Sequence, residues 1–188
     1  METNFLISTN HQKVLSLLAK FSDKEFYERE VARKIGISFG SANKVLNELY
    51  SHGLLTRVQK GKMYFYRMNS EDSVFQQFKI LNTIILLRPL IDELKPLARK
   101  VFLYGSCAKG ADSSESDIDI FIVSNRKQNV LRLIERYSMG KGFEEVKIQP
   151  VILSPLEILK AEKIDKEFLS LVKEGIVLWE KIVDESGV

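Results

Sequence analysis

Residues Val101 to Val123, VFLYGSCAKGADSSESDIDIFIV, contain two apolar runs separated by a polar segment. The first run, Val101 to Tyr104, is typical of a buried strand that ends at a glycine. Gly105 allows a sharp turn and a close approach to a ligand, and Ser106 is a residue type that begins helices. A strand followed by a Gly-Ser turn and a short helix leaves backbone N–H groups free. This pattern favours the binding of a phosphate.

The second apolar run begins with the acidic pair Asp117-Ile118-Asp119. Side chains two residues apart in a strand lie on the same face, so both carboxylates point the same way and Ile118 points the other. Neighbouring carboxylates repel each other and are costly to bury unless a cation lies between them. Oxygen ligands of this kind favour Mg²⁺ or Mn²⁺ that carries substrate phosphates. The stretch therefore predicts a site for a nucleoside triphosphate and a divalent cation.

The spacing of Gly-Ser, ten residues and Asp-x-Asp resembles the signature of the polymerase-β-like nucleotidyltransferase superfamily, and above all its minimal nucleotidyltransferase branch. The residues that carry this resemblance are Gly105, Ser106, Gly110, Ser116, Asp117 and Asp119, with Lys109 where the branch often has arginine. The resemblance implies that the two aspartates hold the metals and that the triphosphate is bound by Gly105, Ser106, Lys109 and Ser116. It also implies transfer of a nucleotidyl group from an NTP, with ATP as the expected substrate, to a hydroxyl acceptor. The alternative is a surface hairpin with a chance pair of aspartates.

A third carboxylate usually completes the metal site in this superfamily, on a neighbouring strand, and helps to deprotonate the attacking hydroxyl. The candidate strand is EEVKIQPVIL, residues 144–153, in which the expected position falls on Gln149. Glutamine neither accepts a proton nor binds Mg²⁺ well. Strand parity places Glu145 on the face of Gln149, so Glu145 is the candidate substitute and third catalytic residue. The alternative is a solvated surface glutamate.

Length and composition indicate a globular cytoplasmic protein. A chain of 188 residues has room for one or two domains, and its hydrophobic fraction of 45% is far from that of disordered chains. Its one cysteine, Cys107, excludes an internal disulfide framework and fits a reducing compartment. The first residues lack the pattern of a signal peptide, and the longest apolar stretch, residues 80–91, is too short to span a bilayer.

Positive charge is concentrated in residues 1–70, which contain 11 Lys and Arg against 6 Asp and Glu, a net charge of +5. The remaining residues contain 17 against 19, a net charge of −2. An excess of one sign in one segment predicts that this segment meets a polyanion.

The basic segment also has a distinct order of expected elements. Helices are predicted from Asn10, over 27–35 and from Ser38, with Gly36 ending the second, and strands over 54–59 and 62–68. This order resembles the winged helix-turn-helix family, which implies double-stranded DNA as partner and the third helix in its major groove. The candidate contacts are Ser38, Ser41, Asn43, Lys44 and Asn47 in the helix, and Lys60 and Lys62 in the wing. The alternatives are a solvated surface and a module that docks proteins.

The chain is thus expected to be an α+β protein with three parts: a winged helix-turn-helix domain over 1–70, a helical linker over 71–98, and a nucleotidyltransferase domain with a small mixed sheet over 99–188. Pro89 and Pro96 are expected to break or kink the helices of the linker.

Two functional classes follow from these expectations. One is a Mg²⁺-dependent nucleotidyltransferase that its winged helix targets or autoregulates. The other is a DNA-binding regulator, antitoxin-like in type, whose nucleotidyltransferase domain senses a nucleotide or is inactive. The resemblance to minimal nucleotidyltransferases implies a protein acceptor or a helical toxin as partner. Since winged helices often bind DNA as dimers, a homodimer is expected.

Overall fold

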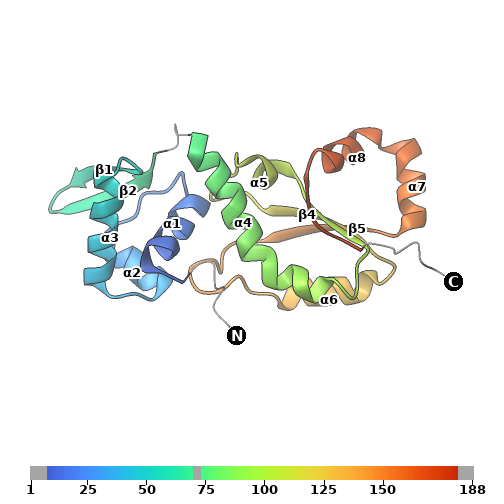
Figure 1. Ribbon diagram of the computed structural model, residues 1–188, viewed down its shortest axis with the longest axis horizontal. Helices are drawn as coiled ribbons and strands as arrows, with labels where there is room; N and C mark the ends of the chain where they lie inside the picture. The colour runs from blue at the N-terminus through green and yellow to red at the C-terminus, as the bar shows by residue number, and fades with distance from the viewer. Residues whose placement is uncertain (1–7, 70–72, 182–188) are drawn as a thin grey trace. The chain divides into compact units, whose positions relative to one another are not determined.

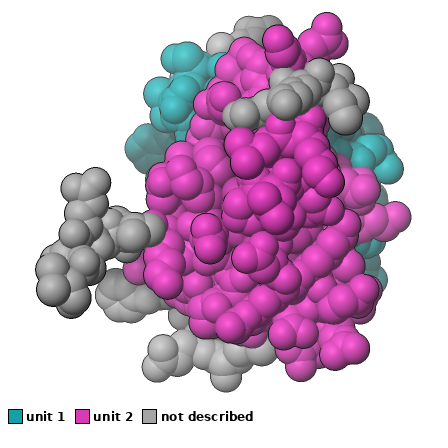
Figure 2. Space-filling model, turned by 90° about the vertical axis from the view of Figure 1, so that its right-hand side faces the viewer, with its two compact units in different colours: residues 1–86, 110–116, 138–146 teal, residues 87–109, 117–137, 147–188 magenta. Residues whose placement is uncertain are grey.

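A computed structural model describes residues 8–69 and 73–181 of the chain. The chain divides into two compact units, coloured separately in Figure 2. The first unit comprises residues 1–86, 110–116 and 138–146, and the second comprises residues 87–109, 117–137 and 147–188. Two loops from the second half of the chain therefore belong to the first unit.

The first unit begins with three helices, whose ends follow from local capping (Figure 1). Helix α1, Asn10–Lys20, is capped by Thr9, so that Asn10, predicted from the sequence as its cap, is the first residue of the helix; Thr9 and Gln12 form a reciprocal capping box. Helix α2, Glu28–Ile35, ends at Gly36, which has a left-handed φ of 70° as expected of a glycine cap. Helix α3, Phe39–Ser51, begins after Ser38, whose side chain accepts a hydrogen bond from the Ser41 N–H.

A two-stranded antiparallel hairpin follows the helices. Strand β1, Leu55–Lys60, pairs with β2, Met63–Met68, across a turn at Gly61 and Lys62. The predicted helices and strands of this segment are confirmed to within a residue or two at each end.

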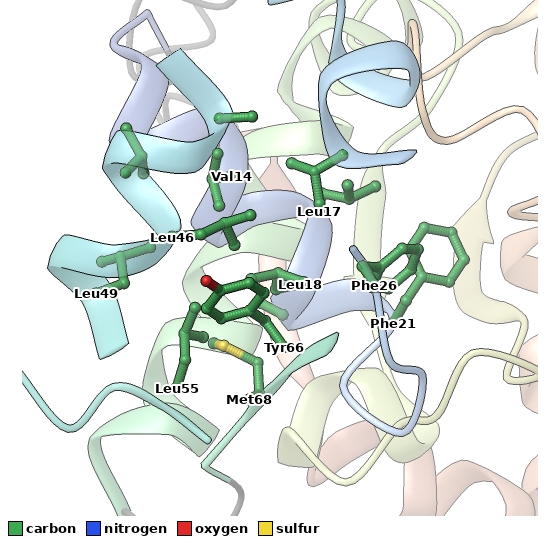
Figure 3. Packing of buried hydrophobic residues seen from close by; sticks show 14 of the residues in the cluster. Val14, Leu17, Leu18, Phe21, Phe26, Leu46, Leu49, Leu55, Tyr66 and Met68 are labelled. Carbon is green, nitrogen blue, oxygen red and sulfur yellow. The ribbon is translucent and has the colours of Figure 1, made fainter. Parts of the chain in front are cut away.

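The core of the first unit joins the helices to the hairpin (Figure 3). Val14, Leu17 and Leu18 of α1 are fully buried because positions three and four apart lie on one side of a helix. They pack in one cluster with Leu46 of α3 and Tyr66 of β2, which are also fully buried.

Helix α4, Ser73–Leu94, spans the division between the units and continues through Pro89. The helix is not broken at Pro89, which lies on its exposed side, and it ends at Leu94 before Pro96. By length and composition alone, α4 passes the test for a membrane-spanning helix, which the core helices of folded domains also pass. However, it carries Lys79 and Asn82 buried within the first unit, and Asn82 Nδ2 donates to the Ser16 carbonyl at 3.2 Å. Such burial is typical of a core helix in a folded domain.

The described part of the second unit contains a mixed sheet of four strands in the order β5-β4-β3-β6, which confirms the small mixed sheet. The strands are β3 Lys100–Leu103, β4 Ile118–Val123, β5 Ile148–Leu153 and β6 Ile176–Glu180. Strand β4 is parallel to β5, while β3 is antiparallel to both β4 and β6. The helices of this unit after α4 are α5 Gly105–Lys109, α6 Lys127–Arg136, α7 Pro155–Ile164 and α8 Lys166–Lys173.

Both faces of β4 are covered by apolar side chains over most of its length. Ile118 and Ile120 are fully buried on one face. On the other face, Phe121 packs with Leu169 and Val172 of α8. This apolar cover ends at the start of β4, where Asp119 is half-buried and the preceding Asp117 is exposed. The fold thus places the acidic pair at the open end of a buried strand.

Candidate active site

The acidic pair and Gln149 lie on one face of the sheet. Asp117 immediately precedes β4 and Asp119 is its second residue, so strand parity directs both carboxylates to the same side. Asp119 lies in register with Gln149 of the parallel strand β5. The position at which the sequence expects a third carboxylate is therefore next to Asp119, and it carries an amide.

The electrostatics of the pair are unfavourable. Burial and the neighbouring Asp117 carboxylate both raise the pKa of Asp119 above its usual range. Among the described residues, neither Asp117 nor Asp119 forms an ion pair with a lysine, arginine or histidine. A cation between the two carboxylates would relieve this repulsion.

Gly105 lies directly beneath the Asp119 carboxylate. Its φ is +72°, and a Cβ at this position would lie 2.3 Å from Asp119 Oδ2. Only glycine fits, for both its conformation and its size. The Tyr104 N–H also donates to the Asp119 carbonyl at 3.1 Å, which joins the end of β3 to β4. The Gly-Ser turn and the acidic pair, twelve residues apart at Gly105 and Asp117, therefore meet at one point.

The other candidate phosphate ligands on α5 are accessible. Ser106 is half-buried in the first turn, and no hydrogen bond of its hydroxyl is found within residues 8–69 and 73–181. Lys109 ends the helix, with its ammonium 3.7 Å from a carboxylate oxygen of Glu174, and both side chains are more than half exposed. Such an exposed pair is weak. Lys109 is free to exchange Glu174 for an anionic ligand.

Ser116 and Glu145 belong to the first unit, together with the loops that carry them. The Ser116 hydroxyl accepts a hydrogen bond from the Ser113 N–H at 2.9 Å, so it is used within its own loop. Glu145 lies in a turn, because the strand expected over 144–153 begins only at Ile148. Phe143 is buried in the first unit, where it stacks on Phe21. The strand-parity argument for Glu145 is therefore wrong, since the chain is not extended between Glu145 and Gln149.

The candidate DNA contacts fall into two groups. The side chains of the first group form contacts within the unit. Asn47 forms hydrogen bonds to α3 and to the hairpin, and Ser38 caps α3. Lys60 forms an ion pair with Glu25 and lies over the Phe65 ring. Ser41 shares the hydroxyl bond of Ser38, and the Asn43 side-chain oxygen lies 3.3 Å from Asn47 Nδ2. Lys44 and Lys62 are exposed. Lys44 forms an exposed ion pair with Glu48 at 3.9 Å, which is weak, and Lys62 forms none with the described residues.

Sequence reasoning missed a buried cluster of Lys20, Lys79 and Asp112 in the first unit. Its signal is the presence of lysines within apolar helical stretches, Lys20 after LSLLA and Lys79 in VFQQFKILN. Nothing in the sequence pairs these lysines with Asp112, which is 92 residues from Lys20.

The carboxylates of Asp117 and Asp119 fit a Mg²⁺ site that is completed by the substrate. Within residues 8–69 and 73–181, no group of three His, Cys, Asp or Glu side chains is placed to hold a metal ion. Mg²⁺, however, is usually held by one or two carboxylates, with substrate phosphates and water as its other ligands. Asp117 and Asp119 fit this pattern.

Comparison with known proteins agrees with this geometry. Residues 85–177 match the family model of the nucleotidyltransferase domain. This segment is thus similar to a nucleotidyltransferase domain. The matched segment contains Gly105, Ser106, Asp117, Asp119 and Gln149 and supports nucleotide transfer as the general activity.

Among solved structures, the chain is similar to a proposed nucleotidyltransferase from Sulfolobus solfataricus. The identity is 20%, the match covers 56% of this chain and 87% of that one, and the TM-score is 0.37. No curated protein matches the chain.

Proposed function

We propose that the nucleotidyltransferase domain transfers an NMP group from an NTP, with ATP as the first candidate, to a hydroxyl acceptor in a Mg²⁺-dependent reaction. One observation carries this proposal: the Asp117 and Asp119 carboxylates have no cationic partner in the described chain, and Asp119 lies against Gly105 of the Gly-Ser turn. A fold under selection only for stability has no reason to keep two like charges together.

Each side chain then has a defined role. Asp117 and Asp119 hold Mg²⁺ or Mn²⁺, which supplies charge neutralisation for the triphosphate and the leaving pyrophosphate. The backbone at Gly105 and the hydroxyl of Ser106 bind phosphate oxygens, and Lys109 leaves Glu174 to neutralise the pyrophosphate. Ser116 contributes by shaping the loop before Asp117, since its hydroxyl is bonded to Ser113.

Among the described residues, the site has no evident general base to remove the proton of the acceptor hydroxyl. Gln149, in register with Asp119, cannot take a proton. Glu145 is a candidate third acid by strand parity alone, and its position in a turn before β5 removes that argument. A second function is therefore favoured by Gln149 specifically: a regulator, antitoxin-like in type, in which the domain binds an NTP without transferring it.

For the first unit we propose a winged helix-turn-helix that binds double-stranded DNA as a homodimer. The support is the net charge of +5 over residues 1–70 and the exposure of Lys44 on α3 and Lys62 at the tip of the hairpin. This unit would then bring the second unit to DNA in the cytoplasm, whether that unit transfers a nucleotide or senses one. The proposed partner is a protein acceptor or a helical toxin.

Incubation with NTPs labelled at the α-phosphate, Mg²⁺ and cell extract tests the transfer. The wild-type protein should label a protein or RNA acceptor, and Asp117→Asn/Asp119→Asn should not. Binding of an NTP without any label transfer would favour the nucleotide-sensing regulator.

A further inference from the structure

The loop of residues 110–116 joins α5 to β4, and so joins the Gly-Ser turn to the acidic pair. Within the first unit, its Asp112 carboxylate lies between two lysines. Lys20 Nζ of α1 is 3.3 Å from Oδ2, and Lys79 Nζ of α4 is 3.2 Å from Oδ1. The exposed fractions of these side chains are 1% for Lys20 and Asp112 and 9% for Lys79. Three charges are thus buried together.

Buried charges are tolerated only when they are paired and hydrogen-bonded. Here one carboxylate faces two ammonium groups, and each ammonium group also donates to a backbone carbonyl. Asp112 Oδ1 forms the ion pair with Lys79 but no hydrogen bond within the described residues. Lys20 Nζ donates to the Ser116 carbonyl at 3.1 Å. Lys79 Nζ donates to the Asp112 carbonyl and lies 3.2 Å from the Ser22 hydroxyl. Because each charged group depends on the others, the cluster holds the loop in one geometry.

Both ends of the loop are fixed as well. Gly110, with φ +66°, is pressed onto α4 so closely that a Cβ would lie 2.5 Å from the Gln76 carbonyl oxygen. Ser116, at the other end, is bonded to Lys20. On the solvent side, the Ser114 N–H and hydroxyl both donate to the Asp23 carboxylate at 2.7 Å. The loop is therefore attached to the first unit at its beginning, middle and end.

We propose that Asp112 is a positioning residue for nucleotide transfer, and that the Lys20–Asp112–Lys79 cluster acts as a clamp through which the first unit fixes the start of the acidic strand. The chain continues directly from Ser116 to Asp117 and from Lys109 to Gly110. A shift of the loop therefore moves Asp117 relative to Gly105. Misplacement of a reacting group by about 1 Å is able to cost about 100-fold in rate. The effect on transfer rests on the proposed function.

Lys20→Met tests the clamp in the full-length protein. Asp112→Asn leaves two buried ammonium groups without a carboxylate and is at risk of not folding. Lys20→Met instead leaves a one-to-one pair of Lys79 and Asp112 and removes the bond to Ser116. Lys24→Met is the matched control, because Lys24 contacts the same loop at Glu115 but forms an exposed pair. Lys20→Met should lower kcat for transfer about 10-fold or more and leave the Kd for the NTP within about threefold, whereas the control should match wild type.

Hydrogen exchange gives a readout that does not require activity. In Lys20→Met, the amide of Tyr104, bonded to the Asp119 carbonyl, should exchange faster, while the amide of Leu46 in α3 should not change. Unchanged exchange at Tyr104 overturns the clamp, and so does faster exchange with an unchanged kcat. If wild type transfers no nucleotide, the proposed function fails, and exchange at Tyr104 alone decides whether the loop is clamped.

Discussion

Helix α3 of the first unit and strand β4 of the second both carry polar side chains predicted to act on ligands, but the fold treats them differently. Asn47 of α3 donates to the Asn43 carbonyl at 2.9 Å and accepts from Arg57 at 3.0 Å and Tyr66 at 3.3 Å. Asp117 and Asp119 have no such cationic or donor side chain in the described chain, and burial together with the Asp117 carboxylate raises the pKa of Asp119. A polar residue in a functional pattern is therefore available to a ligand only where its side chain forms no hydrogen bond or ion pair within the fold.

The largest expected effect is at Asp119. Asp119→Asn should reduce nucleotide transfer by more than about 100-fold, since even partners of metal ligands contribute about 10- to 100-fold. The same change should stabilise the protein at pH 7. Because the pKa of Asp119 is raised above its ordinary value of 3.8 in the folded state, its ionisation costs stability as the pH rises through the folded pKa.

Thermal denaturation between pH 3 and pH 7 checks this sign. The Tm of Asp119→Asn should exceed that of wild type at pH 7, and the difference should vanish as the pH falls below 3.8. A lower Tm than wild type at pH 7 would show that the carboxylate has a stabilising partner, and would remove the contrast with Asn47.

The next effect tests the other side of the comparison. Asn47→Ala should lower the free energy of unfolding by about 1–3 kcal/mol, because it leaves the half-buried Arg57 donor and the buried Tyr66 hydroxyl without their shared acceptor. Urea denaturation measures this change. Unaltered stability together with a loss of DNA binding would instead make Asn47 a contact residue, as its position in the sequence suggested.

The exposed lysines should show the reverse behaviour. Lys44→Ala and Lys62→Ala should each leave the free energy of unfolding within about 0.5 kcal/mol. Each should weaken binding to duplex DNA and reduce the slope of log K against log salt by about 1, because each removes a cation that neutralises one phosphate. Fluorescence anisotropy over a salt series measures both the affinity and this slope. Salt-independent binding, or no binding to any duplex, would contradict a DNA-binding role.

A smaller gain is expected at Gln149. Gln149→Glu adds a third carboxylate in register with Asp119, and should raise the transfer rate about 10-fold at saturating Mg²⁺ if the missing base limits the reaction. Gln149→Ala is the control for loss of the amide. A rate equal to wild type in Gln149→Glu would mean that proton removal does not limit transfer.

The smallest effect is expected at Glu145. Glu145→Gln should change the rate by less than about twofold, because Glu145 lies in a turn before β5 and the strand-parity reason for its role no longer holds. A loss of more than about 10-fold in single-turnover transfer would restore Glu145 as the third acid.

Features that depend on neighbouring residues could be predicted from the sequence. Gly36 ends α2 because a glycine adopts the left-handed cap, and the Gly-Ser and Asp-x-Asp pattern correctly predicted the strands β3 and β4. Features with distant causes were not predictable. The start of β5 at Ile148 depends on the burial of Phe143 against Phe21, which is more than a hundred residues away in the sequence. The clamp at Asp112 likewise requires two lysines from two other helices.

Calorimetric titration of ATP and the other NTPs, with and without Mg²⁺, is the most direct test of a metal-dependent nucleotide site at Asp117 and Asp119. Wild type and Asp117→Asn/Asp119→Asn should be compared at the same pH. Wild type should bind the NTP in a Mg²⁺-dependent manner and the variant should not, because these two carboxylates provide the cation site. Equal binding to both proteins, or no binding of any NTP to wild type, would contradict a metal-dependent nucleotide site at β4.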